Sequence, residues 1–269
     1  MKIVIIPPYR GMNWTPTEGQ YMLRELVAMM TKRGQLEGVE ITIDEGHPTS
    51  HTAENRDDAV YVEVTAGFLK RVKLYGDGSQ VDAIVASAGN DHGFFAARMI
   101  SKIPVTFSFH AALHAASLIG DRSTSVQPVD SSALVMRRYA ENYGLSHKLI
   151  TARNVSYTTT QIAGLSRKYI QGKRVETPEI KKFLDAVMAQ YTAAIEEDRV
   201  DSLLVVFPGL QVFDEEIRKR LDASGYSEIP IVCALSAAVE MAKAMVLMNL
   251  TQAPRAYPSD SLKAKPKFR

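Results

Sequence analysis

Short, largely apolar runs alternate with longer amphipathic segments along most of this chain, and this alternation restricts the fold more than any other feature. The runs include KIVIIPP at 2–8, DAIVAS at 82–87 and DSLLVVFPG at 201–209. Polar and apolar residues do not alternate inside these runs, so we expect strands that are buried on both faces. Strands of this kind belong to parallel sheets that helices cover on both sides. The sequence therefore predicts an α/β fold.

The pattern of strand followed by helix occurs in about eight units, which fall into two sets of four. We therefore predict two duplicated lobes, with boundaries 1–117 plus 235–269 for the first and 118–234 for the second. A ligand is expected between the carboxyl ends of the strands of the two lobes. The expected strands are 2–8, 39–45, 82–87, 103–109, 123–129, 148–155, 201–209 and 229–235. The expected helices are 16–34, part of 54–75, 93–102, 110–120, 131–143, a helix from 177, 213–224 and 236–250. Residues 253–269 are expected to form an irregular arm.

Composition excludes several classes of protein. The 32 basic and 30 acidic residues leave a formal net charge of +2, which offers no basic surface for nucleic acid. A single cysteine excludes an intrachain disulfide framework and indicates a reducing compartment. The apolar start is too short for a signal peptide, and AAVEMAKAMVLMNL at 237–250 is too short to span a bilayer. We expect a cytoplasmic protein with no membrane partner.

Several motifs, taken in their order along the chain, resemble one known family. They are MKIVIIPP, DAIVASAGNDHG, IPVTFSFHAALHAASLIGDR, RRYAENYGL, VDSLLVVFPGL, IPIVCALSAAVEMAKAM and a terminal Tyr-Pro arm rich in Lys. This pattern resembles the aspartate/glutamate/hydantoin racemase superfamily, and most closely its hydantoin and allantoin racemase branch. The resemblance covers nearly the whole chain.

The resemblance implies two pseudo-symmetric Rossmann-like lobes, each with a four-stranded, mainly parallel sheet flanked by helices, and an active site in the cleft between them. It also implies no metal or organic cofactor, a small-molecule substrate and a homo-oligomer. Family racemases use two cysteines, because inversion needs an acid and a base on opposite sides of a planar carbanion. Here the first cysteine position corresponds to Ala88 and the second to Phe207, while Cys233 matches neither. A two-cysteine racemase is therefore not expected.

The turn after 82–87 carries the first group of candidate residues. Its N–H groups at a helix start are suited to bind an anion or a ring carbonyl. Asp91 is a candidate catalytic residue, although Asn90 or Asp91 alternatively caps the helix. His92 is a second candidate acid or base, with a solvated loop histidine as the alternative. Arg10, after the first strand, is suited to bind a carboxylate in two-point fashion, unless it is an ordinary surface arginine.

His110, directly after the strand 103–109, is the third candidate acid or base and is expected at the sheet edge facing the cleft. His114 follows one helical turn later, but the absence of a Glu after His110 argues against a zincin-type metal site. In the second lobe, turn amides near Pro208 are suited to bind an oxyanion. The expected substrate-binding residues are Tyr9, Arg10, Ser87, Ala88, Gly89, Asn90, Gln127, Phe207, Pro208 and Gly209.

Three functions remain open from the sequence. The first is a hydrolase or lyase that acts on a small hydantoin- or thiohydantoin-like ring carrying a carboxylate, for example by hydrolytic desulfurisation. The second is a racemase or isomerase of hydantoin or amino-acid derivatives that uses His92 and His110 as the acid–base pair. The third is a ligand-binding protein without catalytic activity, left after loss of both cysteines.

Overall fold

The computed structural model describes residues 1–12, 15–49 and 58–258, which form two compact units. The first unit is Met1–Ser108 with Ala238–Arg269, and the second is Phe109–Ala237. The second unit thus takes in residues 109–117 and 235–237, which the sequence boundaries gave to the first lobe. For residues 109–117 the reason is packing, because Phe109, Ala112 and Leu113 belong to the core of the second unit.

The first unit contains a four-stranded sheet in the order β3-β1-β5-β6. All three pairings in this sheet are parallel, and β1 lies between β3 and β5. The side chains of Ile3 to Ile6 in β1 are fully buried, as are Ala83 to Val85 in β5, which explains the unbroken apolar runs. The strands are β1 (Lys2–Ile6), β3 (Glu40–Ile43), β5 (Ala83–Ala86) and β6 (Val105–Phe107), with helices α1 (Pro16–Lys32), α2 (Asp58–Tyr75), α3 (Phe94–Ile100) and α10 (Ala234–Leu247).

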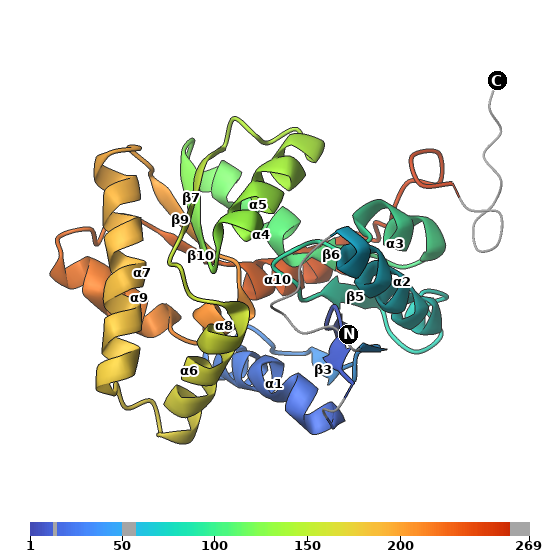
Figure 1. Ribbon diagram of the computed structural model, residues 1–269. Coiled ribbons are helices and arrows are strands. Elements are labelled where there is room, and N and C mark those ends of the chain that lie inside the picture. Colours follow the sequence, from blue (N-terminus) through green and yellow to red (C-terminus); the bar gives the residue numbers. More distant parts are fainter. Residues whose placement is uncertain (13–14, 50–57, 259–269) are drawn as a thin grey trace. The chain divides into compact units, whose positions relative to one another are not determined.

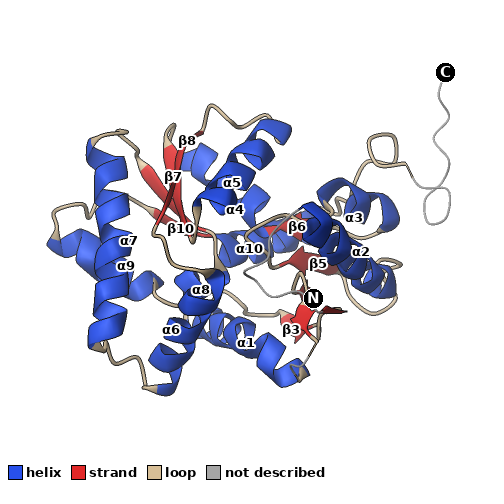
Figure 2. Ribbon diagram, in the orientation of Figure 1, coloured by secondary structure: helices blue, strands red, loops and turns tan. Residues whose placement is uncertain are grey.

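The second unit contains a four-stranded parallel sheet in the order β10-β9-β7-β8. Figure 2 shows blue helices on both sides of its red strands. The strands are β7 (Ser123–Gln127), β8 (Leu149–Asn154), β9 (Ser202–Val205) and β10 (Ile231–Cys233), with helices α4 (Ser108–Ile119), α5 (Asp130–Asn142), α6 (Thr159–Gln171), α7 (Pro178–Glu196), α8 (Pro208–Gln211) and α9 (Asp214–Ala223).

The two sheets have one topology. When the strands of each unit are numbered along the chain, both sheets read 2-1-3-4 across the sheet. This agreement confirms the predicted duplication and the α/β class with parallel sheets. In each sheet the strand order reverses between strands 1 and 3, which are β1 and β5 in one unit and β7 and β9 in the other. Figure 1 labels β5 of the first sheet and β7 and β9 of the second.

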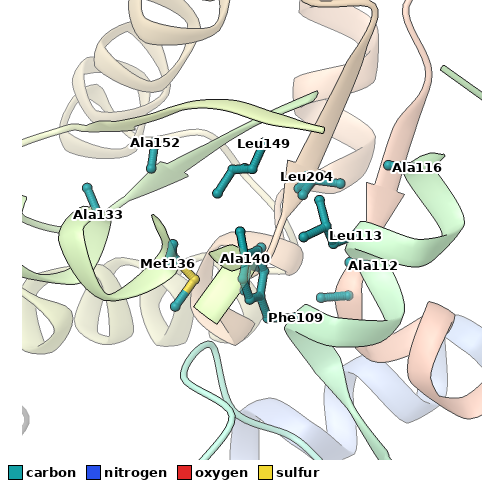
Figure 3. Packing of buried hydrophobic residues seen from close by; sticks show 12 residues of the cluster. Phe109, Ala112, Leu113, Ala116, Ala133, Met136, Ala140, Leu149, Ala152 and Leu204 are labelled. Carbon is teal, nitrogen blue, oxygen red and sulfur yellow. The ribbon is translucent and has the colours of Figure 1, made fainter. Parts of the chain in front are cut away.

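A core on one side of the second sheet holds α4 and α5 in place. Side chains from α4, α5, β8 and β9 meet there, as Figure 3 shows. Met136 and Leu113 are fully buried in this core, and Phe109 packs at the start of α4. The many alanines of α4 and α5 allow the elements to approach closely. This packing fixes the histidines of α4 against α5.

Several elements differ from the sequence prediction. The helix α6 was not predicted, because the polar, Thr-rich stretch 156–161 indicated a loop. Its start is a capping box, in which the Thr158 hydroxyl accepts from Gln161 N–H and the Gln161 side chain accepts from Thr158 N–H. The short helix α8 and the two-residue strands β2 (Arg10–Gly11) and β4 (Pro48–Thr49) were also not predicted. Residues 54–57 of one predicted helix and 259–269 of the predicted arm lie outside the described residues.

Within the described ranges, every helix is too short or too polar to cross a lipid bilayer.

Candidate functional site

The candidate residues follow the strands at which each sheet reverses its order. In open parallel sheets, ligands bind beyond the carboxyl ends of the strands at such a reversal. Tyr9 and Arg10 follow β1, and residues 87–93 follow β5. In the second unit Gln127 ends β7, and Phe207 follows β9. Each unit therefore places its candidate residues at the edge where the topology favours a ligand.

The backbone at the start of the turn after β5 is fixed by hydrogen bonds to neighbouring strands. The N–H of Ser87 donates to the carbonyl of Ile6 at 3.0 Å, which extends the pairing of β1 and β5. The hydroxyl of Ser108 donates to the carbonyl of Ala86 at 2.9 Å. Ala88, the residue after Ser87, is buried, with 6% of its surface exposed. A methyl group thus stands at the end of the central strand, where it offers no acid–base chemistry.

The helix after this turn begins differently from the prediction. Its first residue is Phe94, and its N-cap is Gly93, with φ at 68° and no side-chain capping bond. The helix thus begins later than the alternative in which Asn90 or Asp91 is its N-cap. Instead the backbone carbonyl of Asp91 accepts from Phe94 N–H at 3.3 Å, and the Asp91 side chain is fully buried.

His92 lies in an aromatic setting rather than in solvent. Only 9% of its surface is exposed, and its ring lies 5.1 Å from that of Tyr61 on α2. The side-chain amide of Asn90 donates to the hydroxyl of Tyr61 at 2.6 Å. The solvated-loop interpretation of His92 is therefore wrong. Tyr61 joins Asn90 and His92 into one cluster, which keeps His92 in a restricted orientation.

Tyr9 and Arg10 are held by a short two-stranded ribbon. The N–H of Arg10 donates to the carbonyl of His47 at 2.9 Å, and β2 pairs with β4. Gly46 supports this arrangement, since its φ is +74° and a Cβ there would lie 3.0 Å from the Tyr9 carbonyl carbon. Both Tyr9 and Arg10 are half-buried. The backbone of Arg10 is thus fixed near the end of β1, as a carboxylate-binding role requires.

His110 is a residue of a helix that follows a strand directly. Strand β6 ends at Phe107 and α4 begins at Ser108, so His110 lies in the first turn of that helix. Its Nε2 lies 3.1 Å from Nε2 of His114. The ring of Tyr143, at the end of α5, lies edge-on to His110 with centroids 4.8 Å apart. The predicted strand thus ends two residues earlier than expected, at Phe107, and His110 follows it on α4, which belongs to the second unit.

The turn after β9 is tightly built. Phe207 is the N-cap of α8, and its carbonyl accepts from the N–H groups of Leu210 at 2.9 Å and Gln211 at 3.1 Å. Pro208 has no N–H, so an oxyanion at this turn would be bound through the N–H of Gly209. A Cβ on Gly209 would lie 2.8 Å from the ring of Phe207, so the ring lies directly over this glycine.

Gln127 ends β7 with 3% of its surface exposed. Its carbonyl accepts from Val155 N–H at 3.1 Å, while its side-chain Nε2 has no hydrogen-bond partner within the described residues. A buried amide nitrogen of this kind is costly without a partner. This is the one property of Gln127 that agrees with its predicted role in binding a polar substrate group.

A model of the Asp/Glu/hydantoin racemase family matches residues 10–242 of this chain. The chain belongs to this family. Among its relatives, a hydantoin racemase from Pseudomonas sp. (strain NS671) is 22% identical over 67% of this chain, and the match spans 64% of that protein, less than two thirds of its length. A hydantoin racemase from Rhizobium meliloti is 23% identical over 76% of each chain.

A solved structure of the family shares the fold over the full length. The allantoin racemase from Klebsiella pneumoniae superimposes with a TM-score of 0.73 at 18% identity, covering 98% of this chain and 96% of its own. These relatives are enzymes that act on small molecules. At such identities the agreement establishes the fold, and the chemistry must be argued from the residues of this chain.

Two residues of this family member were not found from the sequence. Tyr61 and Tyr143 contact His92 and His110, but each comes from a helix remote in sequence and looks like an ordinary packing residue. Tyr61 lies in none of the motifs, and Tyr143 lies in RRYAENYGL, a motif that carried the resemblance but indicated no role for this tyrosine. Among the residues that the structure describes, no group of three or more His, Cys, Asp or Glu side chains is placed to hold a metal ion.

Proposed function

We propose that this protein is an enzyme of the racemase family that hydrolyses or cleaves a small hydantoin- or thiohydantoin-like ring bearing a carboxylate. The observation that carries the proposal is the pair of residues after the two equivalent central strands. Ala88 follows β5 and Phe207 follows β9, and these are the positions to which the resemblance assigns the two racemase cysteines. Neither side chain transfers a proton, so two-sided thiol chemistry has no residues to perform it.

The acid–base groups that remain favour reaction at a ring carbon. His92 in the first unit and His110 in the second carry imidazole rings, which can act as either acid or base in proton transfer. In hydrolytic desulfurisation, a base removes a proton from water and the oxygen adds to the thiocarbonyl carbon. The intermediate then collapses to a carbonyl as the C–S bond breaks, and an acid protonates the leaving sulfide. Water and the thiocarbonyl thus become a carbonyl and hydrogen sulfide.

The ring carbonyl or thiocarbonyl needs hydrogen-bond donors as charge develops on it. The N–H of Gly209 and the backbone N–H groups of 88–90 are the donors that we assign to this role. Asp91, fully buried beside His92 in the sequence, is assigned as its orienting or proton-accepting partner. The buried amide nitrogen of Gln127 is assigned to a second ring oxygen.

The carboxylate of the substrate is assigned to Arg10. A guanidinium forms two parallel hydrogen bonds with a carboxylate, and a fixed backbone reduces the entropy lost on binding. The ribbon of β2 and β4 fixes that backbone. Tyr9, half-buried beside it, is assigned to the wall of the same subsite.

A second candidate is racemisation with histidines in place of cysteines. It is supported by the relatives, which are named hydantoin racemase and allantoin racemase. It requires one imidazole on each face of the substrate, and His92 and His110 would have to supply them.

The test is to incubate hydantoin- and thiohydantoin-propionates with the protein in D2O and to follow them by NMR, with a sulfide assay in parallel. Ring opening or sulfide release supports the proposal, whereas exchange of the Cα proton without hydrolysis supports racemisation. Binding without any turnover would indicate a ligand-binding protein and would reject both. His92→Gln and His110→Gln should each reduce turnover about 100-fold or more, while His147→Gln, at an exposed loop position, is the matched control.

A further inference from the structure

The histidine pair of α4 has a feature that the proposed function does not use. His110 and His114 lie four residues apart, one helical turn, so their side chains share a face of the helix. Their Nε2 atoms are 3.1 Å apart, and the ring centroids are 4.3 Å apart at an angle of 63°. These values describe a direct nitrogen-to-nitrogen hydrogen bond.

Aromatic side chains of α5 hold this pair in place. The ring of Tyr143 meets that of His110 at 89°, and Tyr139 stacks on Tyr143 with centroids 5.9 Å apart at 23°. Phe109, next to His110, is fully buried in the core between α4 and α5 (Figure 3). The ring of His110 is therefore confined on one side by tyrosines and on another by His114.

A hydrogen bond between two Nε2 atoms fixes where the protons lie. In a neutral imidazole one ring nitrogen carries hydrogen and the other has a lone pair. Two Nε2–H groups would repel each other, and so would two lone pairs. The neutral pair therefore contains one ring protonated at Nε2 and one protonated at Nδ1, and each ring determines the tautomer of the other.

We propose that His114 is a positioning residue that sets the tautomer of His110 and passes protons to and from it. The proposal rests on the proposed function, in which His110 is an acid–base group. When His110 gives the proton on its Nδ1 to the reacting molecule, its Nε2 takes the proton from Nε2 of His114. His114 then takes a proton from solvent at Nδ1. One proton moves from solvent to the reactant, and the pair returns to the neutral state with its tautomers exchanged.

The tautomers can be measured without a substrate. The full-length protein, labelled with nitrogen-15 in histidine and kept in EDTA, is studied by long-range nitrogen–proton NMR at a pH about two units above the usual imidazole pKa of ~6.5. Single His→Gln variants assign the signals. Opposite tautomers in His110 and His114 are expected, and His114→Ala should change the tautomer of His110. His147→Ala, from the exposed loop, should leave it unchanged.

Two results would overturn the proposal. One is the same tautomer in both rings, or a His110 signal that His114→Ala does not alter. The other is a change in the nitrogen signals of His110 and His114 when EDTA is omitted. Such a change would show that the two Nε2 atoms bind a metal ion and are not hydrogen-bonded to each other.

Kinetics separate the proton relay from simple packing. His114→Gln keeps a hydrogen-bonding group beside His110 but cannot pass a proton on, and His114→Ala removes both. Turnover should fall about tenfold or more in both variants with KM unchanged, and the solvent isotope effect should rise. If His110→Gln abolishes turnover and His114→Gln does not, the relay is wrong while the proposed function stands. If His92→Gln and His110→Gln both leave turnover intact, the proposed function fails, and the NMR result still decides the tautomers.

Discussion

Asp44, at the end of β3, and Arg71, on α2, form a two-point ion pair in the first unit. Nε and Nη2 of Arg71 donate to the carboxylate at 2.9 and 2.7 Å, and the Tyr75 hydroxyl donates to it at 2.8 Å. The side chain of Asp44 is fully buried. This carboxylate therefore joins the end of the edge strand β3 to α2, the helix that also carries Tyr61, the contact of His92.

The first prediction concerns the loss of this carboxylate. Asp44→Asn should lower the free energy of unfolding by about 3–5 kcal/mol, because it removes the buried partner of the Arg71 guanidinium and leaves only the more exposed Glu45 as its counter-charge. Urea denaturation followed by circular dichroism measures the change. Glu40→Gln is the control, since its ion pair with Lys2 is exposed and long at 3.9 Å, and it should cost about 0–1 kcal/mol. Equal effects of the two substitutions would contradict the assignment of Asp44 as a structural anchor.

The second prediction concerns alkaline stability. Burial, together with the hydrogen bond to Asp44, raises the pKa of Tyr75 to about 12, and burial together with Glu216 raises the pKa of Tyr169 to about 12. The pKa of tyrosine in the unfolded chain is about 10. Between these values the folded state binds more protons than the unfolded state, so the stabilisation is complete below about pH 10 and is lost as the pH rises toward 12.

Urea denaturation at a series of alkaline pH values tests this dependence. The free energy of unfolding should decrease as the pH rises through this window. Tyr75→Phe and Tyr169→Phe should each make the decrease shallower, because phenylalanine does not titrate. A slope that neither substitution changes would show that other groups cause the alkaline loss.

The third prediction compares two glycines inside helices. A Cβ on Gly67 of α2 would lie 2.5 Å from the His47 ring and 3.0 Å from the His47 Cβ, so the backbone of the two elements would have to separate. Gly67→Ala should therefore destabilise the protein by about 1–3 kcal/mol. Gly164 of α6 has open space around it, and Gly164→Ala should stabilise by about 0.5–1 kcal/mol. Thermal unfolding of both variants checks the opposite signs, and a common sign would refute the packing argument.

The sequence predicted the sheets well because their strands are buried on both faces. Runs such as AIVA in β5 and SLLV in β9 are almost wholly apolar, so they lack the polar face of an amphipathic helix and are not mistaken for one. It missed α6 because that helix starts in a polar stretch, although the Thr158 and Gln161 capping pair was a readable signal. The unit boundary was misplaced because α4 follows β6 directly, and only three-dimensional packing shows that α4 joins the second core.

The placement of the candidate residues directly after the strands could be predicted from the sequence, whereas their neighbours in space could not. The turns after β5 and β9 follow from strand order, which the repeat in the sequence already indicated. The contacts of His92 with Tyr61 and of His110 with Tyr143 are tertiary, and no periodicity within one helix predicts them. The His110–His114 spacing was visible, but the spacing alone favoured neither a hydrogen bond nor a metal site.

The last prediction concerns Cys233, the single cysteine of the chain. It ends β10, and its Sγ donates to Oδ2 of Asp214 at 3.4 Å. A thiolate there would face a carboxylate, which repels it, so this cysteine is a poor nucleophile or base. Cys233→Ser, which keeps a hydrogen-bond donor, and Cys233→Ala should both retain kcat/KM within about twofold. Treatment with iodoacetamide should likewise leave the turnover of ring substrates unchanged. The contrary outcome is a folded Cys233→Ala variant that loses turnover, together with inactivation of the native protein by iodoacetamide. This outcome would show that Cys233 is a catalytic thiol. The absence of cysteine at Ala88 and Phe207 would then no longer argue against thiol chemistry.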